Sequence, residues 1–261
     1  MSESDLLIDH RDAVSWLYLN RPRALNAISP KCMTEFGEAL AMLRDRAETR
    51  VIVISGKGRA FCAGADLGTA TPSSPDPSGG PSFLQRAQQM EDVLNAMSKP
   101  VIAAINGICC AGGLEIALMC DFIVAAASAR IGDAHANVAA MPGSGSTARL
   151  SHLVGPNFAR YLLFSGELLP AAEMAAAGLV TRVVEDAALE QDVQALAQKI
   201  SEKSPLMLRR MKDLVRQAFD LPLPLAAKME KLVSAEHMQS WDAVEGVRAF
   251  AEKRKPQFRG C

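Results

Sequence analysis

The sequence predicts an α/β fold with a helical tail. Two short apolar runs, Val51–Ser55 and Val101–Ile105, are typical of buried strands. Segments with helical spacing of apolar residues separate the expected strands, whereas the chain is helical from about Asp186 to about Lys255. Alternating strands and helices indicate a layered core, so the last helices must pack outside that layer. Another subunit is a plausible partner for their apolar faces.

The first third of the chain contains recognisable element boundaries. Residues 5–20 are expected to form two strands around a turn at residues 10–12, and Ser29 followed by Pro30 predicts the start of a helix that reaches about Arg46. A second helix is expected over residues 83–97. The Pro-, Ser- and Gly-rich residues 69–82 before it predict a surface loop. Residues 56–68 and 107–113 are interpreted as glycine-rich turns.

The second half continues the same pattern. Residues 122–125 are expected to form a buried strand, and residues 143–145 lead into a helix that either Ser144 or Ser146 would cap. Residues 180–184 are a candidate last strand. Breaks are expected at residues 155–156, 170, 204–205 and 221–224. The chain has no internal repeat of solenoid length.

The residues from Lys99 to Asp121 are the most informative stretch. Glu115 is the only charged side chain between these two ends, and it directly follows Gly112 and Gly113 at the start of an apolar helix. Burying an ionised carboxylate without partners is costly. One explanation is that Glu115 interacts with the helix dipole. The other is catalytic: glycines expose backbone N–H groups that can hold an oxyanion, while the adjacent carboxylate moves protons.

Composition excludes several classes of function. The net charge of −1 gives no electrostatic basis for binding nucleic acid or an anionic membrane, and only 5% of residues are aromatic. Residues 56–68 fit neither a P-loop nor a dinucleotide-binding glycine motif. Six cysteines form no CxxC pair and have no histidine at metal-ligand spacing, so we expect free thiols, no metal and a cytoplasmic location. The N-terminal residues predict no signal peptide, and the chain has no apolar run long enough to span a membrane.

Five motifs occur in an order that resembles the crotonase superfamily, and within it the enoyl-CoA hydratases and isomerases. They are NRPRALNA, GRAFCAGADL, KPVIAAINGICCAGGLEIALMCD, PGSGSTARL and FAEKRKPQF. The resemblance implies a spiral of ββα units over residues 1–200 and a helical trimerisation region over residues 201–261. It also implies an acyl-CoA substrate, no further cofactor, and a homotrimer or a hexamer made of two trimers.

The resemblance also assigns roles to residues. The backbone N–H groups of Ala65 and Gly112 would hold the thioester oxygen, and Glu115 would be catalytic. The positions matching coenzyme A or substrate contacts are Arg23, Ala24, Leu25, Ala63, Asp66, Leu67, Gly143, Phe250 and Lys253. In the family, the last two contacts often come from a neighbouring subunit.

The sequence departs from the family pattern at one important position. Hydratases of this family use a second glutamate 20 residues after the first, where this chain has His135. Histidine can serve as an acid or a base near neutral pH, so Glu115 could activate water while His135 donates a proton, or the reverse. His135 could instead fill space or hydrogen-bond the backbone. Asp133 is a second candidate, ranked lower because it lies outside the matching position.

Three functions are therefore compatible with the sequence. The first is enoyl-CoA hydration by a Glu/His pair, which we favour. The second is another crotonase reaction, such as double-bond isomerisation, which needs proton transfer but no water. The third is an acyl-CoA-binding protein with little catalysis, which the retained Glu115 argues against. The length and shape of the acyl group are not readable from the sequence.

Overall fold

The computed structural model describes residues 4–69 and 80–261, whose strands form two sheets. The larger sheet has the order β1-β2-β3-β5-β7-β10, and all its neighbours are parallel except β1 and β2. Its strands are β1 (Leu6–Arg11), β2 (Val14–Leu19), β3 (Val51–Gly56), β5 (Val101–Ile105), β7 (Phe122–Ala126) and β10 (Arg182–Val184). The smaller sheet has the order β4-β6-β8-β9 and comprises β4 (Ala60–Cys62), β6 (Ile108–Cys110), β8 (Arg130–Gly132) and β9 (Leu169–Pro170).

The two sheets arise from a repeated unit of two strands and a helix. In three successive repeats the first strand joins the larger sheet, the second joins the smaller sheet, and a helix follows. The helices of these repeats are α2 (Phe83–Asn95), α3 (Gly112–Met119) and α4 (Ser146–Ser165). This is the ββα arrangement that the sequence resemblance implies.

The smaller sheet corrects the interpretation of residues 56–68 and 107–113 as turns. Strands β4, β6 and β8 lie within residues 56–68, 107–113 and 128–143, and each has only three residues. Strands this short are not visible as an alternating pattern, and they are defined by pairing with one another. The last strand of the larger sheet is also shorter than the expected 180–184. Part of the expected loop, residues 70–79, lies outside the described residues.

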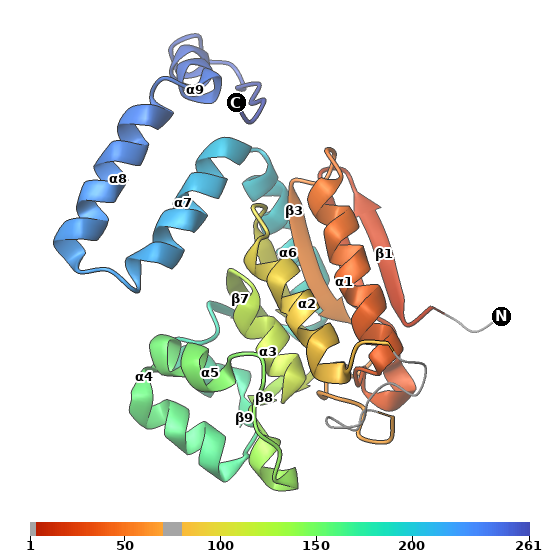
Figure 1. The fold of residues 1–261 in the computed structure, drawn as a ribbon. Coiled ribbons are helices and arrows are strands. Elements are labelled where there is room, and N and C mark those ends of the chain that lie inside the picture. The colour runs from red at the N-terminus through yellow and green to blue at the C-terminus, as the bar shows by residue number, and fades with distance from the viewer. Residues whose placement is uncertain (1–3, 70–79) are drawn as a thin grey trace.

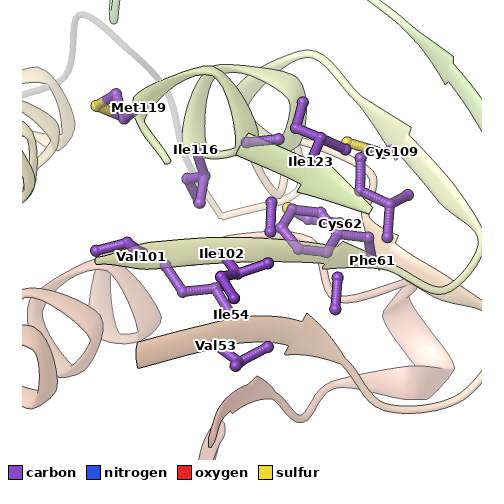
Figure 2. Packing of buried hydrophobic residues seen from close by; sticks show 14 of the residues in the cluster. Val53, Ile54, Phe61, Cys62, Val101, Ile102, Cys109, Ile116, Met119 and Ile123 are labelled. Carbon is purple, nitrogen blue, oxygen red and sulfur yellow. The ribbon is translucent and has the colours of Figure 1, made fainter. Parts of the chain in front are cut away.

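One core joins both sheets to the helices. Helix α6 (Leu189–Ser201) packs along β2, β3, β5 and β7, while α1 (Pro30–Asp45) packs against α2. Figure 2 shows how side chains of β3 and β5 meet those of β4, β6 and α3 in this core. The central strands β2, β3 and β5 are wholly buried, which explains why β3 and β5 are nearly continuous apolar runs.

Helix boundaries confirm some sequence signals and correct one. The Ser29 hydroxyl accepts a hydrogen bond from the amide of Cys32, so Ser29 caps α1 as expected. Helix α4 is interrupted at Gly155, which has a φ of 76° before Pro156. Neither Ser144 nor Ser146 caps α4, however. Gly145 precedes its first turn in a left-handed conformation and provides no side-chain cap.

The last helices extend away from the layered core. After α5 (Ala171–Ala176) and α6, the chain forms α7 (Pro205–Ala218), α8 (Leu223–His237) and α9 (Trp241–Ala251). Figure 1 shows these three blue helices projecting from the side of the molecule, with the C-terminus beside α9. We call α7–α9 the C-terminal arm. A division of the chain between residues 200 and 201 stays a prediction. Among the described residues, no helix is long and apolar enough to cross a membrane.

Candidate active site

The predicted oxyanion residues lie on two turns that touch. Gly64 has a φ of 94°, and a Cβ placed there would lie 2.7 Å from the Cβ of Ala111. A Cβ placed on Gly112 would lie 3.8 Å from the amide nitrogen of Ala65. The first turn follows Cys62 at the end of β4, and the second joins the end of β6 to Gly112 at the start of α3. The pairing of β4 with β6 therefore brings the two turns together.

Both amides are available to a ligand. Within the part of the chain that the structure describes, neither the N–H of Ala65 nor that of Gly112 donates to a protein acceptor. For Gly112 this follows from its place in the first turn of α3, where helix N–H groups have no acceptor four residues earlier. Ala111 before it has a φ of 50°, a left-handed conformation that is strained for alanine.

The two glycines before Glu115 have different roles. A Cβ on Gly113 would lie 2.2 Å from the carbonyl oxygen of Cys62, so only glycine lets α3 pack onto β4. A Cβ on Gly112 would meet no heavy atom closer than 3.7 Å. Packing thus accounts for Gly113, whereas at Gly112 the space beside the backbone fits the expectation that a glycine here exposes its N–H group.

Glu115 is buried where the starts of two helices meet. It lies in the first turn of α3 and is 5% exposed. Its Oε1 accepts hydrogen bonds from the amides of Ser144 at 2.7 Å and Ser146 at 3.5 Å, at the start of α4. Burial raises its pKa above the ordinary glutamate value, although these hydrogen bonds oppose that shift. A carboxylate with a raised pKa is a stronger base toward water near neutral pH.

His135 forms a pair with Asp133, the residue that sequence reasoning ranked lower. The His135 Nδ1 lies 2.9 Å from Asp133 Oδ1, and the His135 amide donates to the same oxygen at 3.2 Å. Burial works to lower the pKa of His135, but Asp133 and then Glu115 outweigh it, and the net pKa is raised. Asp133 is 1% exposed. The sequence signal that could have predicted this pair is the spacing itself, an aspartate two residues before a histidine.

The residues expected to bind coenzyme A fall into two groups. The first group surrounds Ala65, since the loop over residues 21–28 is hydrogen-bonded to the loop over residues 63–66. In this group Asp66 accepts from Arg21 at 2.9 Å, which lowers the pKa of Asp66. The sequence did not single out Arg21 as a partner of Asp66. Members of this group are Arg23, Ala24, Leu25, Ala63, Asp66 and Leu67.

The other expected contacts lie elsewhere. Gly143 precedes Ser144, so it lies beside Glu115, and a Cβ on it would lie 3.6 Å from Leu84 of α2. Phe250 and Lys253 belong to α9 and the residues after it, at the far end of the C-terminal arm from the loop between β2 and α1 (Figure 1). Within one chain the structure therefore does not bring Phe250 and Lys253 to the other predicted contacts. No cluster of three or more metal-ligating side chains occurs among the described residues.

The ββα repeats and the paired turns before a buried glutamate define the crotonase class of proteins. Comparison with known proteins makes the assignment more specific. The family model described as enoyl-CoA hydratase/isomerase matches residues 9–261, and the chain belongs to this family.

Individual relatives match along the whole chain. It is 32% identical to a crotonyl-CoA hydratase of Syntrophomonas wolfei over 259 residues, which cover 99% of each chain. It is 36% identical to a carnitinyl-CoA dehydratase of Citrobacter koseri over 266 residues, which cover all of both chains. A crystal structure of an enoyl-CoA hydratase from Bacillus anthracis superposes with a TM-score of 0.91 at 33% identity, covering 99% of this chain and 100% of the other.

Proposed function

We propose that this chain hydrates the α,β double bond of an enoyl-CoA thioester. The observation that carries the proposal is a buried Glu115, with a raised pKa, electrostatically coupled to His135 and three residues after a helix N-terminus whose amide is available. In this reaction Glu115 accepts a proton from water as the water oxygen bonds to the β-carbon. The amides of Ala65 and Gly112 stabilise the enolate oxygen, and His135 supplies a proton to the α-carbon. Family membership and the hydratases among the relatives support the same activity.

The thioester would extend from this centre along the loops beside Ala65. Arg23 is exposed there, and a guanidinium suits the phosphates of coenzyme A. Ala24, Leu25, Ala63, Asp66 and Leu67 would line the same path, and Gly143 would border the acyl group. The proposed chemistry needs no cofactor beyond the coenzyme A that is part of the substrate. The six free cysteines, three of them buried, support a reducing, cytoplasmic location.

We infer that the protein assembles into a homotrimer or a hexamer through the C-terminal arm. Helix α8 has no buried residue, and large apolar side chains on α7–α9 are exposed within one chain. A cavity of about 950 Å³ also separates α7 from α3 and α4. Phe250 and Lys253 could then contact the coenzyme A of a neighbouring copy, since they are remote from the site of their own chain (Figure 1).

The first test is hydration of crotonyl-CoA and longer or branched enoyl-CoAs, followed by loss of enoyl absorbance. Glu115→Gln and His135→Ala should each lower kcat by about 10²–10⁴-fold, because each removes a proton-transfer group. Met42→Asp on the outer face of α1 serves as a control and should retain activity. If His135→Ala is nearly as active as wild type, His135 only fills space. If wild type binds these thioesters unchanged, hydration is wrong, and isomerisation of 3-enoyl-CoAs is the next assay.

A further inference from the structure

Asp133 connects the two halves of the proposed site. Its backbone carbonyl accepts a hydrogen bond from the Ala111 amide at 2.7 Å, which holds the turn immediately before Gly112. Its carboxylate Oδ1 lies 2.9 Å from His135 Nδ1. A 3₁₀ helix, His135–Val138, starts after Ala134, whose left-handed φ of 60° folds His135 back over Asp133. One residue therefore positions both the oxyanion turn and the imidazole.

The chemistry of this contact fixes which nitrogen carries a proton. An ionised carboxylate only accepts hydrogen bonds, so the Nδ1 of His135 must be the donor. Burial works to raise the pKa of Asp133, but the hydrogen bonds from His135, an interaction with the Ser146 hydroxyl and the charge of His135 together outweigh it, so the pKa lies below the ordinary aspartate value. Asp133 Oδ2 is also buried and has no hydrogen-bond partner among the described residues. A buried negative charge is best balanced by a nearby positive one.

We infer that Asp133 is a positioning residue, which keeps the proton on Nδ1 of His135 and so leaves Nε2 to exchange protons with the substrate. This inference rests on the proposed hydration. The carboxylate of Asp133 acts only through His135, since it is buried and bonded to the imidazole. It replaces the second glutamate of the family pattern by a pair, in which histidine supplies the proton and aspartate holds the histidine.

The proton count closes over one turnover. Glu115 takes one proton from water, the hydroxide oxygen bonds to the β-carbon, and the electron pair of the double bond passes to the enolate. Nε2 of the His135 imidazolium gives its proton to the α-carbon, which leaves a neutral imidazole protonated on Nδ1. Transfer of the proton on Glu115 to Nε2, through solvent, restores the starting state.

Among the described residues, two charged groups act on His135: Asp133 on the turn after β8, and Glu115 on α3. Both are carboxylates, so both favour the imidazolium. Removing the Asp133 charge should thus move the titration of His135 to lower pH, while Glu115 still opposes part of that change. The direct hydrogen bond makes Asp133 the larger contributor.

Nuclear magnetic resonance can test this pairing without any activity assay. The chain has four histidines, so their ring signals can be separated, and a His135→Gln variant identifies the one from His135. At high pH, ¹⁵N shifts of wild type should show the proton on Nδ1. A neutral ring protonated on Nε2 would overturn the inference. Asp133→Asn should lower the pH midpoint of His135, whereas Asp242→Asn, at an equally buried aspartate on α9, should leave it unchanged.

Kinetics of Asp133→Asn give the functional half of the test. We expect kcat to fall by about 10²-fold or more with KM changed less than about 3-fold, because substrate contacts remain. The alkaline limb of the pH profile should shift to lower pH. An unchanged midpoint and profile, in a variant whose thermal unfolding shows it to be folded, would reduce Asp133 to a structural role. Another outcome separates the two proposals. If Asp133→Asn shifts the His135 midpoint but the wild-type protein hydrates no enoyl-CoA, the proposed function is refuted and the pairing of Asp133 with His135 stands.

Discussion

At the scale of single residues, the site depends on where Glu115 accepts its hydrogen bonds. The carboxylate belongs to α3 but receives amide hydrogen bonds from the start of α4. Two helix N-termini therefore favour its charge, while burial disfavours it. The net result is a raised pKa. The helix-dipole explanation suggested by the sequence thus fits this residue, while its catalytic role stays a prediction.

The pKa shifts predict a bell-shaped pH dependence of kcat/KM. Glu115 must be ionised to accept a proton, so activity falls as the pH drops through its raised pKa. His135 must be protonated, so activity falls as the pH rises through its pKa, which lies above the ordinary value of 6.5. Initial rates with crotonyl-CoA across pH 4–10 give this profile. A profile with a single limb would show that only one of the two groups transfers protons.

At the scale of elements, the contact between α3 and β4 sets the position of the oxyanion turn. Gly113 lies so close to the carbonyl of Cys62 that even a methyl group would force the helix away from the strand. Gly64 and Ala111 hold the facing turns in left-handed conformations. The two oxyanion turns thus follow short strands, and Ala111 takes a conformation that is strained for alanine.

Substituting Gly113 tests this contact. Gly113→Ala should lower the free energy of unfolding by about 1–3 kcal/mol or more, because the added Cβ overlaps backbone atoms that cannot move easily. It should also lower kcat by displacing Gly112 and Glu115. Thermal or urea unfolding measures the first effect. Gly37→Ala is the matched control, because Gly37 lies inside α1 and its new Cβ would lie 3.8 Å from the nearest atom of Met90 on α2. The higher helix propensity of alanine should therefore stabilise this variant by about 0.5–1 kcal/mol. Equal stability of both variants would contradict the packing argument.

At the scale of the whole molecule, the C-terminal arm leaves apolar surface without a partner in one chain. On α9, Val244 and Val247 are three residues apart on one helix face and are 58% and 63% exposed. Exposed apolar side chains gathered on one part of a molecule indicate an interface. The arm is held together from within: Asp242 accepts hydrogen bonds from Ser204 and Gly260.

Charges placed on the arm should therefore prevent assembly. The double variant Val244→Asp, Val247→Asp is expected to sediment as a monomer, while wild type sediments as a trimer or hexamer, because burying unpaired carboxylates is costly. Met42→Asp, at an exposed apolar position on α1, should leave the oligomer intact. Analytical ultracentrifugation distinguishes these masses. A monomeric wild type would refute the inferred interface.

Part of this fold and site could be predicted because it depends on local sequence. Strands β3 and β5 are nearly continuous apolar runs, since both of their faces are buried. Ser29 caps α1 by accepting a hydrogen bond from the amide of Cys32, three residues later. Glu115 could be singled out because it is the only charge in an apolar stretch. The resemblance to a family then supplied Ala65 and Gly112, which no periodic pattern would have identified.

Only the tertiary structure decided which residues far apart in the sequence come into contact. The sequence alone determined the α/β class and the helical tail, and its resemblance to the family added the histidine at the position of the second glutamate. Three-residue strands stay invisible until β4, β6 and β8 pair, and that pairing places Ala65 beside Gly112. The partners of Glu115 at the start of α4, and the turn that folds His135 onto Asp133, also depend on how the backbone closes in space. The sequence determines which chemical groups are present. Their hydrogen-bond partners and pKa shifts depend on burial and distance, which are set by how the chain packs.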